Sequence, residues 1–260
     1  MSQYQSETIL KDSFIRHVEY HPTLESTNLL AVELKEELAA CAPALVLTDE
    51  QTAGRGRGAN AWWSAAGAMT FSVVLDADQQ GPSPELRPLV ALATGLAVRS
   101  MIHDLLPDHH VQTKWPNDVL VADRKICGIL TEQHATPAGS ILIIGIGVNV
   151  NNSMSAAPAE VRQRATSAFD LSGQSYDLTD TLNRLLNHLD QSLTRLKLDH
   201  SSIVTEFAQH HRLTGQHVTI DTHTGLVIGE CTGLADDGAL QLQIDGQEQE
   251  VRAGTVLEFT

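Results

Sequence analysis

The stretch Gln51-Thr52-Ala53-Gly54-Arg55-Gly56-Arg57-Gly58-Ala59-Asn60-Ala61-Trp62-Trp63 lies between two apolar runs, residues 45–47 and 69–75. Three glycines alternate with two arginines, so the backbone can bend through positive φ and present N–H groups beside two guanidinium groups. This combination is suited to binding anionic oxygens, and the adjacent tryptophans offer flat apolar surface to a ligand. Taken alone, the stretch is equally compatible with a solvated surface loop.

The segments on either side of this loop carry periodic patterns. The two apolar runs predict buried strands, and leucines at helical spacing predict a helix over residues 26–40. Ser26, Thr27 and Asn28 at its start are all good N-cap residues, and their side chains could also meet a polar ligand group. Residues up to about 14 show no period and predict a short tail.

Charged residues interrupt a strand-like region farther along the chain. The run Lys114-Trp115-Pro116-Asn117-Asp118 separates two predicted strands, and Lys125 begins the next one after a tight turn. Charges are avoided in such apolar sequence unless they are paired or used. The three charged residues therefore predict either a structural ion pair or a functional cluster.

A further apolar strand ends in Gly145-Ile146-Gly147-Val148-Asn149. The third glycine of a dinucleotide fingerprint is missing and no helix pattern follows, which excludes that motif. We expect a strand packed closely under another backbone. Asn149 could read a base or hold a loop.

The C-terminal part of the chain divides into helices and then short strands. Helices are expected over residues 89–105, 159–164, 178–196 and 203–211. From residue 213 the pattern changes to alternating strands with turns at Asp236-Asp237-Gly238 and Asp245-Gly246, which predicts a small β-barrel. The histidine pairs at 109–110 and 210–211 have no partners at metal-ligand spacing and are expected on the surface.

Composition limits the classes of ligand and compartment. The net charge of −15, from 17 basic and 32 acidic residues, repels nucleic acid and anionic membranes. An RGG-type nucleic-acid segment is therefore disfavoured, and an anionic ligand must bind where the basic residues gather. Three widely spaced cysteines, no signal-peptide pattern and no apolar run of spanning length predict a cytoplasmic protein without a membrane partner.

These motifs, taken in order from Ser26-Thr27-Asn28 to Asn149, strongly resemble those of biotin protein ligases. The resemblance covers nearly everything from about residue 23 to the C-terminus. It implies an α+β fold, in which a class II synthetase-like biotin/lipoate ligase catalytic domain with a mixed sheet and helices (residues 1–212) precedes a small SH3-like β-barrel (residues 213–260). The chain departs from the best-known bacterial members after Arg57, where they carry further basic residues. No DNA-binding domain fits before Tyr20, so we expect no specific DNA binding.

The resemblance also implies a reaction. ATP activates biotin to biotinyl-5′-adenylate, and biotin is then transferred to a lysine of the carboxyl carrier domain of acetyl-CoA carboxylase or a related enzyme. Mg²⁺ accompanies the ATP, no metal is held directly by the protein, and the protein is a monomer or homodimer. A lipoate-protein ligase and a non-catalytic biotin or adenylate sensor are the alternatives; the Trp-Pro-Asn-Asp run and the barrel favour biotin, and the presence of Lys125 and Arg57 disfavours a sensor.

Site residues follow from the same resemblance. The expected catalytic residues are Lys125, Arg57, Lys114 and Asp118, with Asp118 acting as a base or an orienting group. The expected biotin contacts are Ser26, Thr27, Asn28, Gln51, Arg55, Gly56, Arg57, Trp62, Lys125 and Gly128. The expected nucleotide contacts are Arg55, Arg57, Lys114, Asn117, Lys125 and Asn149.

Overall fold

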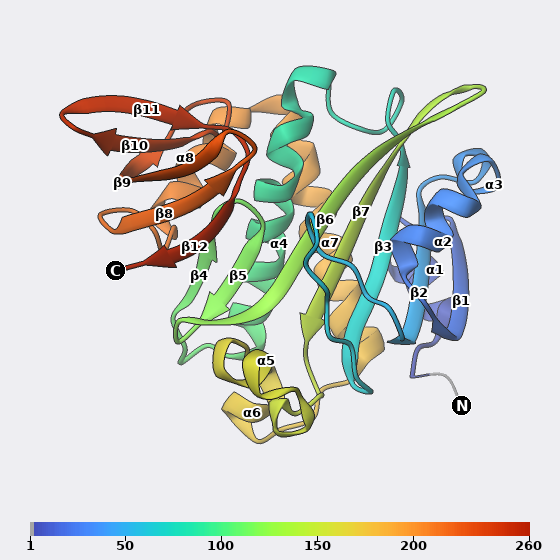
Figure 1. The fold of residues 1–260 in the computed structure, drawn as a ribbon. Helices are drawn as coiled ribbons and strands as arrows, with labels where there is room; N and C mark the ends of the chain where they lie inside the picture. Colours follow the sequence, from blue (N-terminus) through green and yellow to red (C-terminus); the bar gives the residue numbers. More distant parts are fainter. Residues whose placement is uncertain (1–2) are drawn as a thin grey trace.

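A seven-stranded sheet forms the centre of the molecule in the computed structural model, which describes residues 3–260 (Figure 1). In spatial order its strands are β1 (His17–Leu24), β2 (Ala44–Gln51), β3 (Ala68–Asp76), β7 (Gly139–Asn149), β6 (Arg124–Thr136), β5 (Asp118–Val121) and β4 (Val111–Lys114). The β1–β2 pair is parallel and the other pairs are antiparallel. The predicted mixed sheet is therefore confirmed.

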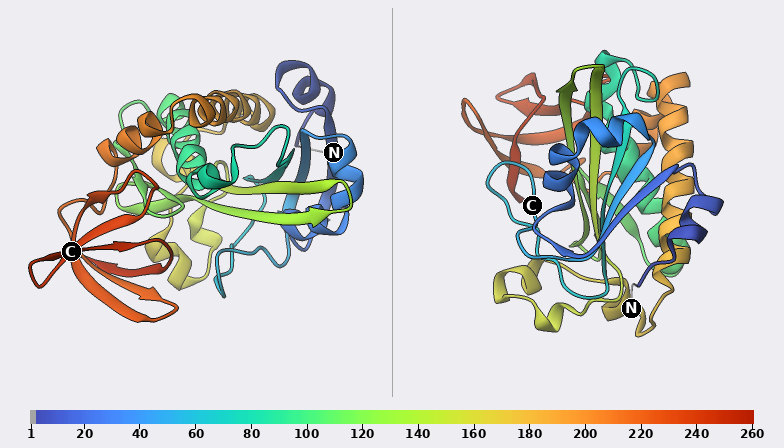
Figure 2. Two further views of the ribbon diagram at one scale, coloured as in Figure 1. Left: turned by 90° about the horizontal axis from the view of Figure 1, so that it is seen from above. Right: turned by 90° about the vertical axis from the view of Figure 1, so that its right-hand side faces the viewer.

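Helices cover both faces of this sheet. The helices on one face are α4 (Val90–Leu105), α7 (Leu178–Leu198) and α8 (His200–Gln209), and those on the other are α2 (Thr27–Glu33) and α3 (Lys35–Ala40) (Figure 2). Successive side chains of β2 point to opposite faces of the sheet. Leu45 and Leu47 belong to the core under α4 and α7, whereas Val46 packs with Ala31 and Leu38 on the other face. The strands are thus apolar on both faces.

The N-terminal residues form a helix, α1 (Ser6–Asp12), so the predicted tail is wrong. Ile9 is fully buried in the main core and Tyr4 is nearly so, against α7. A seven-residue helix with one buried residue shows no period in the sequence, since its burial depends on α7. The predicted helix over residues 26–40 is in fact two, separated at Leu34, where ψ is 19°.

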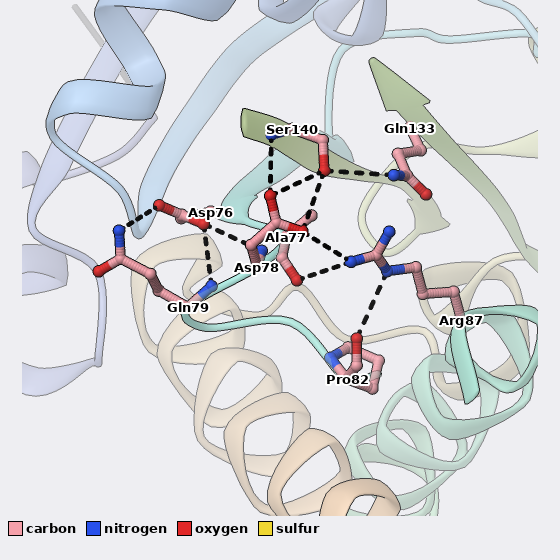
Figure 3. A network of polar contacts seen from close by, with 8 residues as sticks. All are labelled: Asp76, Ala77, Asp78, Gln79, Pro82, Arg87, Gln133 and Ser140. Atoms are coloured by element: carbon pink, nitrogen blue, oxygen red, sulfur yellow. Dashed lines mark hydrogen bonds and ion pairs between the residues drawn. The ribbon is translucent and has the colours of Figure 1, made fainter. Parts of the chain in front are cut away.

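The two ends of the large sheet differ. At one end lie the loop of residues 52–67, α5 (Ala159–Arg164) and α6 (Ala168–Ser172) (Figure 1). At the other end Asp78 accepts hydrogen bonds from Ser140 and Arg87, which ties the end of β3 to the β6–β7 hairpin (Figure 3). The short 3-10 helices are η1 (Pro84–Leu89) and η2 (Met154–Ala156).

A second, antiparallel sheet of five strands follows. It contains β8 (His217–Thr222), β9 (Gly225–Leu234), β10 (Leu240–Ile244), β11 (Gln247–Val251) and β12 (Thr255–Phe259), in the order β11-β10-β9-β8-β12. Asp245 and Gly246, with φ of 49° and 80°, form the two-residue β10–β11 turn. The predicted strands and turns are confirmed here. No helix within residues 3–260 combines the length and apolarity needed to cross a membrane.

Contacts at the edge strand β4 attach the second sheet to the first. Thr113 donates its N–H to the His210 carbonyl at 2.9 Å, at the end of α8, and Trp115 Nε1 donates to the Gly238 carbonyl, in the β9–β10 turn of the second sheet, at 3.1 Å. His211 is only 7% exposed and its Nε2 accepts from the Trp115 N–H at 3.2 Å, so its predicted place on the surface is wrong. Burial, followed by the Lys114 charge, lowers the pKa of His211 to about 3.

Candidate active site

A cavity of about 340 Å³ opens on the face of the large sheet that carries α2. Its walls come from the start of α2, the loop of residues 52–67, the β4–β5 turn, β6, β7, α5 and β12. Every predicted site residue lines it: Ser26, Thr27, Asn28, Gln51, Arg55, Gly56, Arg57, Trp62, Lys114, Asn117, Asp118, Lys125, Gly128 and Asn149. Their roles toward ligands stay predictions.

Glycines form the floor of the cavity. Gly147 of β7 pairs with Gly128 of β6, and the neighbouring Gly145 lies on the same face. A Cβ atom at Gly147 would collide with the Trp62 indole, and one at Gly145 would collide with the Asn28 side chain. The strand is closely packed, but the expected neighbouring backbone is wrong, because the Trp62 and Asn28 side chains approach it instead.

The Gly-Arg loop closes into a narrow hairpin over this floor. Gly56 N donates to the Asn60 carbonyl at 2.8 Å, and Trp62 N donates to the Gly54 carbonyl at 2.9 Å. The Trp62 ring lies 5.9 Å from Lys125 Nζ. Its Nε1 is buried and has no acceptor within residues 3–260, so a ligand oxygen could supply the missing hydrogen bond.

Three charged side chains meet at the β4–β5 turn and β6. Asp118 Oδ1 lies 2.6 Å from Lys125 Nζ, and Asp118 Oδ2 lies 3.7 Å from Lys114 Nζ. Burial lowers the pKa of Lys114 and the Lys125 charge adds to this, while Asp118 opposes it. The cluster holds two positive charges against one carboxylate, which suits it to receive a further anion.

The two arginines of the loop have different surroundings. Arg57 Nη1 donates to the Gly254 carbonyl at 3.2 Å, next to β12, whereas Arg55 is exposed at the rim of the cavity. Burial lowers the pKa of Arg57, and the Asp118 charge opposes this. Arg57 therefore connects the loop to the second sheet, which the sequence alone did not indicate.

Two asparagines position the surrounding backbone. Asn117 Nδ2 donates to the Ile129 carbonyl at 2.6 Å, which joins the β4–β5 turn to β6. Asn149 Oδ1 accepts from Asn152 Nδ2 at 3.0 Å at the start of the loop after β7. These amides are partly committed within the protein, and their contact with a nucleotide stays a prediction.

The start of α2 forms the polar end of the cavity. Ser26 occupies the N-cap position but its side chain makes no capping hydrogen bond. Gln51 Oε1, from β2, accepts instead from the Thr27 N–H at 2.7 Å. Capping therefore does not account for the hydroxyl groups of Ser26 and Thr27, which both line the cavity.

Some lining residues were missed by reasoning from the sequence. Arg164 reaches the cavity because Thr166 N donates to the Lys125 carbonyl at 2.9 Å, holding the loop after α5 against β6. Thr255 and Val256 line it from the second sheet. Arg164 is one of few basic residues in an acidic chain, which is a weak indication of an anion site. No local sequence pattern marks Thr255 or Val256.

Comparison with known proteins gives consistent matches. Residues 20–151 match the model of the Biotin/lipoate A/B protein ligase family. The chain is 31% identical to the Bifunctional ligase/repressor BirA of Bacillus subtilis, over 88% of this chain and 70% of that protein. It is also 31% identical to the Biotin--[acetyl-CoA-carboxylase] ligase of Mycobacterium tuberculosis, over 83% and 79% of the two chains.

A solved structure has a similar fold over nearly the whole chain. The biotin protein ligase from Aquifex aeolicus in complex with biotin and ATP superposes with a TM-score of 0.78 and 26% identity, covering 95% of this chain and 98% of that one. The predicted fold class is thereby confirmed. The chain belongs to the biotin/lipoate A/B protein ligase family.

Proposed function

We propose that the protein uses ATP to convert biotin into biotinyl-5′-adenylate and then transfers the biotin to a lysine of a biotin carboxyl carrier domain. The observation that carries this proposal is the Lys114–Asp118–Lys125 cluster beside Arg57 at one side of a cavity whose other side presents Thr27 and Gln51. Cationic groups suit a carboxylate and phosphates, and the hydroxyl and amide suit a polar ring.

The named relatives support the choice of substrates. The Aquifex aeolicus ligase is described in complex with biotin and ATP, and the Mycobacterium tuberculosis relative is named for acetyl-CoA carboxylase. Biotin, ATP and the carrier subunit of such a carboxylase are accordingly the substrates proposed here.

The first step joins two anions. A biotin carboxylate oxygen attacks the α-phosphorus of ATP, a new O–P bond forms, and pyrophosphate leaves. Negative charge increases on the phosphoryl oxygens, so fixed cations nearby lower the barrier. Arg57, Lys114 and Lys125 are assigned to this task, and Asp118 holds the two ammonium groups in place before substrate binds.

The second step requires a neutral amine. A free lysine has a pKa near 10.4 and is mostly protonated at neutral pH. Its amine must lose a proton, attack the biotinyl carbonyl carbon and expel AMP. Asp118 is the only carboxylate among the residues that line the cavity, so it either accepts this proton or orients the amine.

Mg²⁺ belongs to the proposal only as a companion of ATP. Asp118 is already engaged by two ammonium groups, and no group of three or more His, Cys, Asp or Glu within residues 3–260 is arranged to hold a metal ion. The residues present do not fit a protein-held Mg²⁺, and no step is assigned to the ion.

The test combines purified carrier domain with residues 1–260, ATP, Mg²⁺ and either biotin or lipoate. We expect intact mass to show one biotin per carrier and no lipoyl product. Modification by lipoate alone would favour the lipoate ligase, and binding of biotin without turnover would favour a sensor. A carrier variant with its acceptor lysine replaced by arginine is the matched control and should remain unmodified.

Other predictions complete this proposal. The widely spaced, unpaired cysteines favour a reducing compartment, so we propose a cytoplasmic protein, and we propose that it is a monomer or homodimer. The net charge of −15 opposes sequence-specific binding of DNA. A gel shift with salt-resistant, sequence-dependent retention would overturn the last prediction.

A further inference from the structure

A chain of hydrogen bonds begins behind the polar end of the cavity, at Asn28. One end of its buried amide lies 2.7 Å from Glu132 Oε2 and 3.4 Å from the Leu130 carbonyl oxygen. Both partners can only accept, so this end of the amide is the NH₂ group. Asn28 Oδ1 therefore faces the other way, toward Ser72 Oγ at 2.6 Å.

The direction of the next hydrogen bonds follows from counting protons. A hydroxyl group has one proton, and Ser72 must donate it to Asn28 Oδ1, which can only accept. Ser72 Oγ also lies 2.7 Å from Thr27 Oγ1, and with its own proton committed it can only accept there. Thr27 thus donates its single hydroxyl proton to Ser72. Thr27 Oγ1 also lies 3.2 Å from Gln51 Oε1, but donation there would leave the closer Ser72–Thr27 contact without a proton. Gln51 Oε1 accepts from the Thr27 backbone N–H at 2.7 Å instead.

We propose that Glu132, Asn28 and Ser72 are positioning residues that hold the Thr27 hydroxyl as an obligate hydrogen-bond acceptor toward the cavity. Glu132 and Ser72 do not line the cavity, so they act through Thr27. The site then selects a ligand with an N–H donor at this point and rejects one that presents an oxygen there. The inference rests on the proposed function, in which the N–H group belongs to the ureido ring of biotin.

A purely structural role for the same bonds makes a different prediction. Anchoring α2 to β3 and β6 would affect all ligands of the cavity alike, whether they donate or accept at Thr27. Fixing the direction of the Thr27 proton instead changes the ratio between the affinity for a ligand that donates at Thr27 and the affinity for one that accepts there. That ratio is the quantity to measure.

The test compares biotin with its two isomeric cyclic-carbamate analogues, in which one ureido N–H is replaced by a ring oxygen. Calorimetry without ATP gives the ratio of each analogue's Kd to that of biotin. In the wild type one isomer should bind roughly 10- to 100-fold more weakly, because two acceptor oxygens would face each other. In Ser72→Ala the Thr27 proton is free to turn toward the ligand, and the ratio should fall to within about threefold.

Glu132→Gln provides a second variant at a position remote from the ligand. The amide of the introduced glutamine can donate to Asn28, which allows the Asn28 amide to rotate so that its NH₂ group faces Ser72. The ratio of analogue Kd to biotin Kd should therefore also fall, but by less than in Ser72→Ala. The control is Thr48→Val, which removes a buried hydroxyl from β2 outside the chain of bonds and should keep the wild-type ratio.

Two results would overturn the inference: a wild-type ratio near one for both isomers, or an unchanged ratio in the variant proteins that fold. A wild-type protein that fails to biotinylate the carrier domain overturns the proposed function. If the wild type biotinylates the carrier but the affinity ratio is unchanged in the variants, only the role of Glu132, Asn28 and Ser72 is overturned.

Discussion

At the scale of single residues, the ammonium of Lys125 is the group whose removal should separate chemistry from binding. Lys125 Nζ lies 2.6 Å from Asp118, next to the place assigned to the phosphoryl group. Lys125→Met keeps the aliphatic stem and removes the charge, so pyrophosphate release should slow by roughly 10²–10³-fold. Biotin affinity, measured by calorimetry, should change by less than about tenfold. The control Lys11→Met, at an exposed position on α1, should release pyrophosphate at the wild-type rate. Loss of biotin affinity in Lys125→Met with an unchanged rate of pyrophosphate release would contradict the role of Lys125 in activation.

Gly147 provides a steric prediction at the same scale. A methyl group there would collide with the Trp62 indole, and the ring must move off the cavity floor. Gly147→Ala should therefore weaken biotin binding and shift the tryptophan fluorescence, with overpacking that costs about 1–3 kcal/mol of stability. Gly95→Ala in α4 is the control, because the nearest atom to its added Cβ is 3.5 Å away. Unchanged fluorescence in Gly147→Ala would show that the indole does not rest on this strand.

At the scale of elements, the Gly-Arg loop is held to the second sheet by the hydrogen bond from Arg57 to the Gly254 carbonyl. Arg57→Gly removes this hydrogen bond and the charged guanidinium group, so the loop should cover the bound biotinyl-adenylate less well. This reactive mixed anhydride should then escape from the site. With biotin, ATP and albumin but no carrier, this variant should label albumin well above the wild type. Arg252→Gly, which changes an exposed arginine between β11 and β12 that does not line the cavity, should not increase albumin labelling. Unlabelled albumin during continued pyrophosphate release would refute the retention argument.

At the scale of the whole molecule, His211 lies where the two sheets meet, between the Trp115 N–H and the Thr214 hydroxyl, which is 3.2 Å from His211 Nδ1, and it makes the stability of the protein sensitive to pH. Its pKa of about 3 lies below the ordinary 6.5, so below pH 6.5 the unfolded chain binds a proton that the folded chain does not. Stability should be fully present above pH 6.5 and fall as the pH drops toward 3, by roughly 2 kcal/mol at pH 5 from this residue alone. Urea unfolding at pH 7.5 and pH 5 measures it. His211→Gln, which can still accept from Trp115, should lose this part of the pH dependence; an identical dependence in both proteins would exclude His211 as its source.

The domain boundary also belongs to this scale. We propose that it lies between Arg212 and Leu213, where the chain leaves the large sheet after the Arg212 N–H donates to the Thr113 carbonyl at 2.8 Å. The Trp115–Gly238 and His211–Thr214 hydrogen bonds cross this boundary. Thr255 and Val256 line the cavity, so the small sheet serves as a wall of the site.

Local patterns in the sequence were sufficient for much of the fold and for many of the residues that line the cavity. The strands β2 and β3, the leucine stripe of α7 and the Asp245-Gly246 turn were predicted because their signals arise from neighbouring residues and from the φ values that glycine accepts. The predicted site residues, all of which line the cavity, were found through motifs that are each contiguous in the chain, whereas Arg164, Thr255 and Val256 belong to no such motif.

Only the tertiary structure decided which partners these residues have. The helix α1, the burial of His211, the Arg57–Gly254 bond and the chain from Glu132 to Thr27 all join segments far apart in sequence. Such contacts leave no periodic signal, because each depends on one residue whose neighbours are supplied by the packing of sheets and helices. The sequence by itself determined the kinds of chemical groups at the site, and the folded chain decided their hydrogen-bond partners and the directions of their protons.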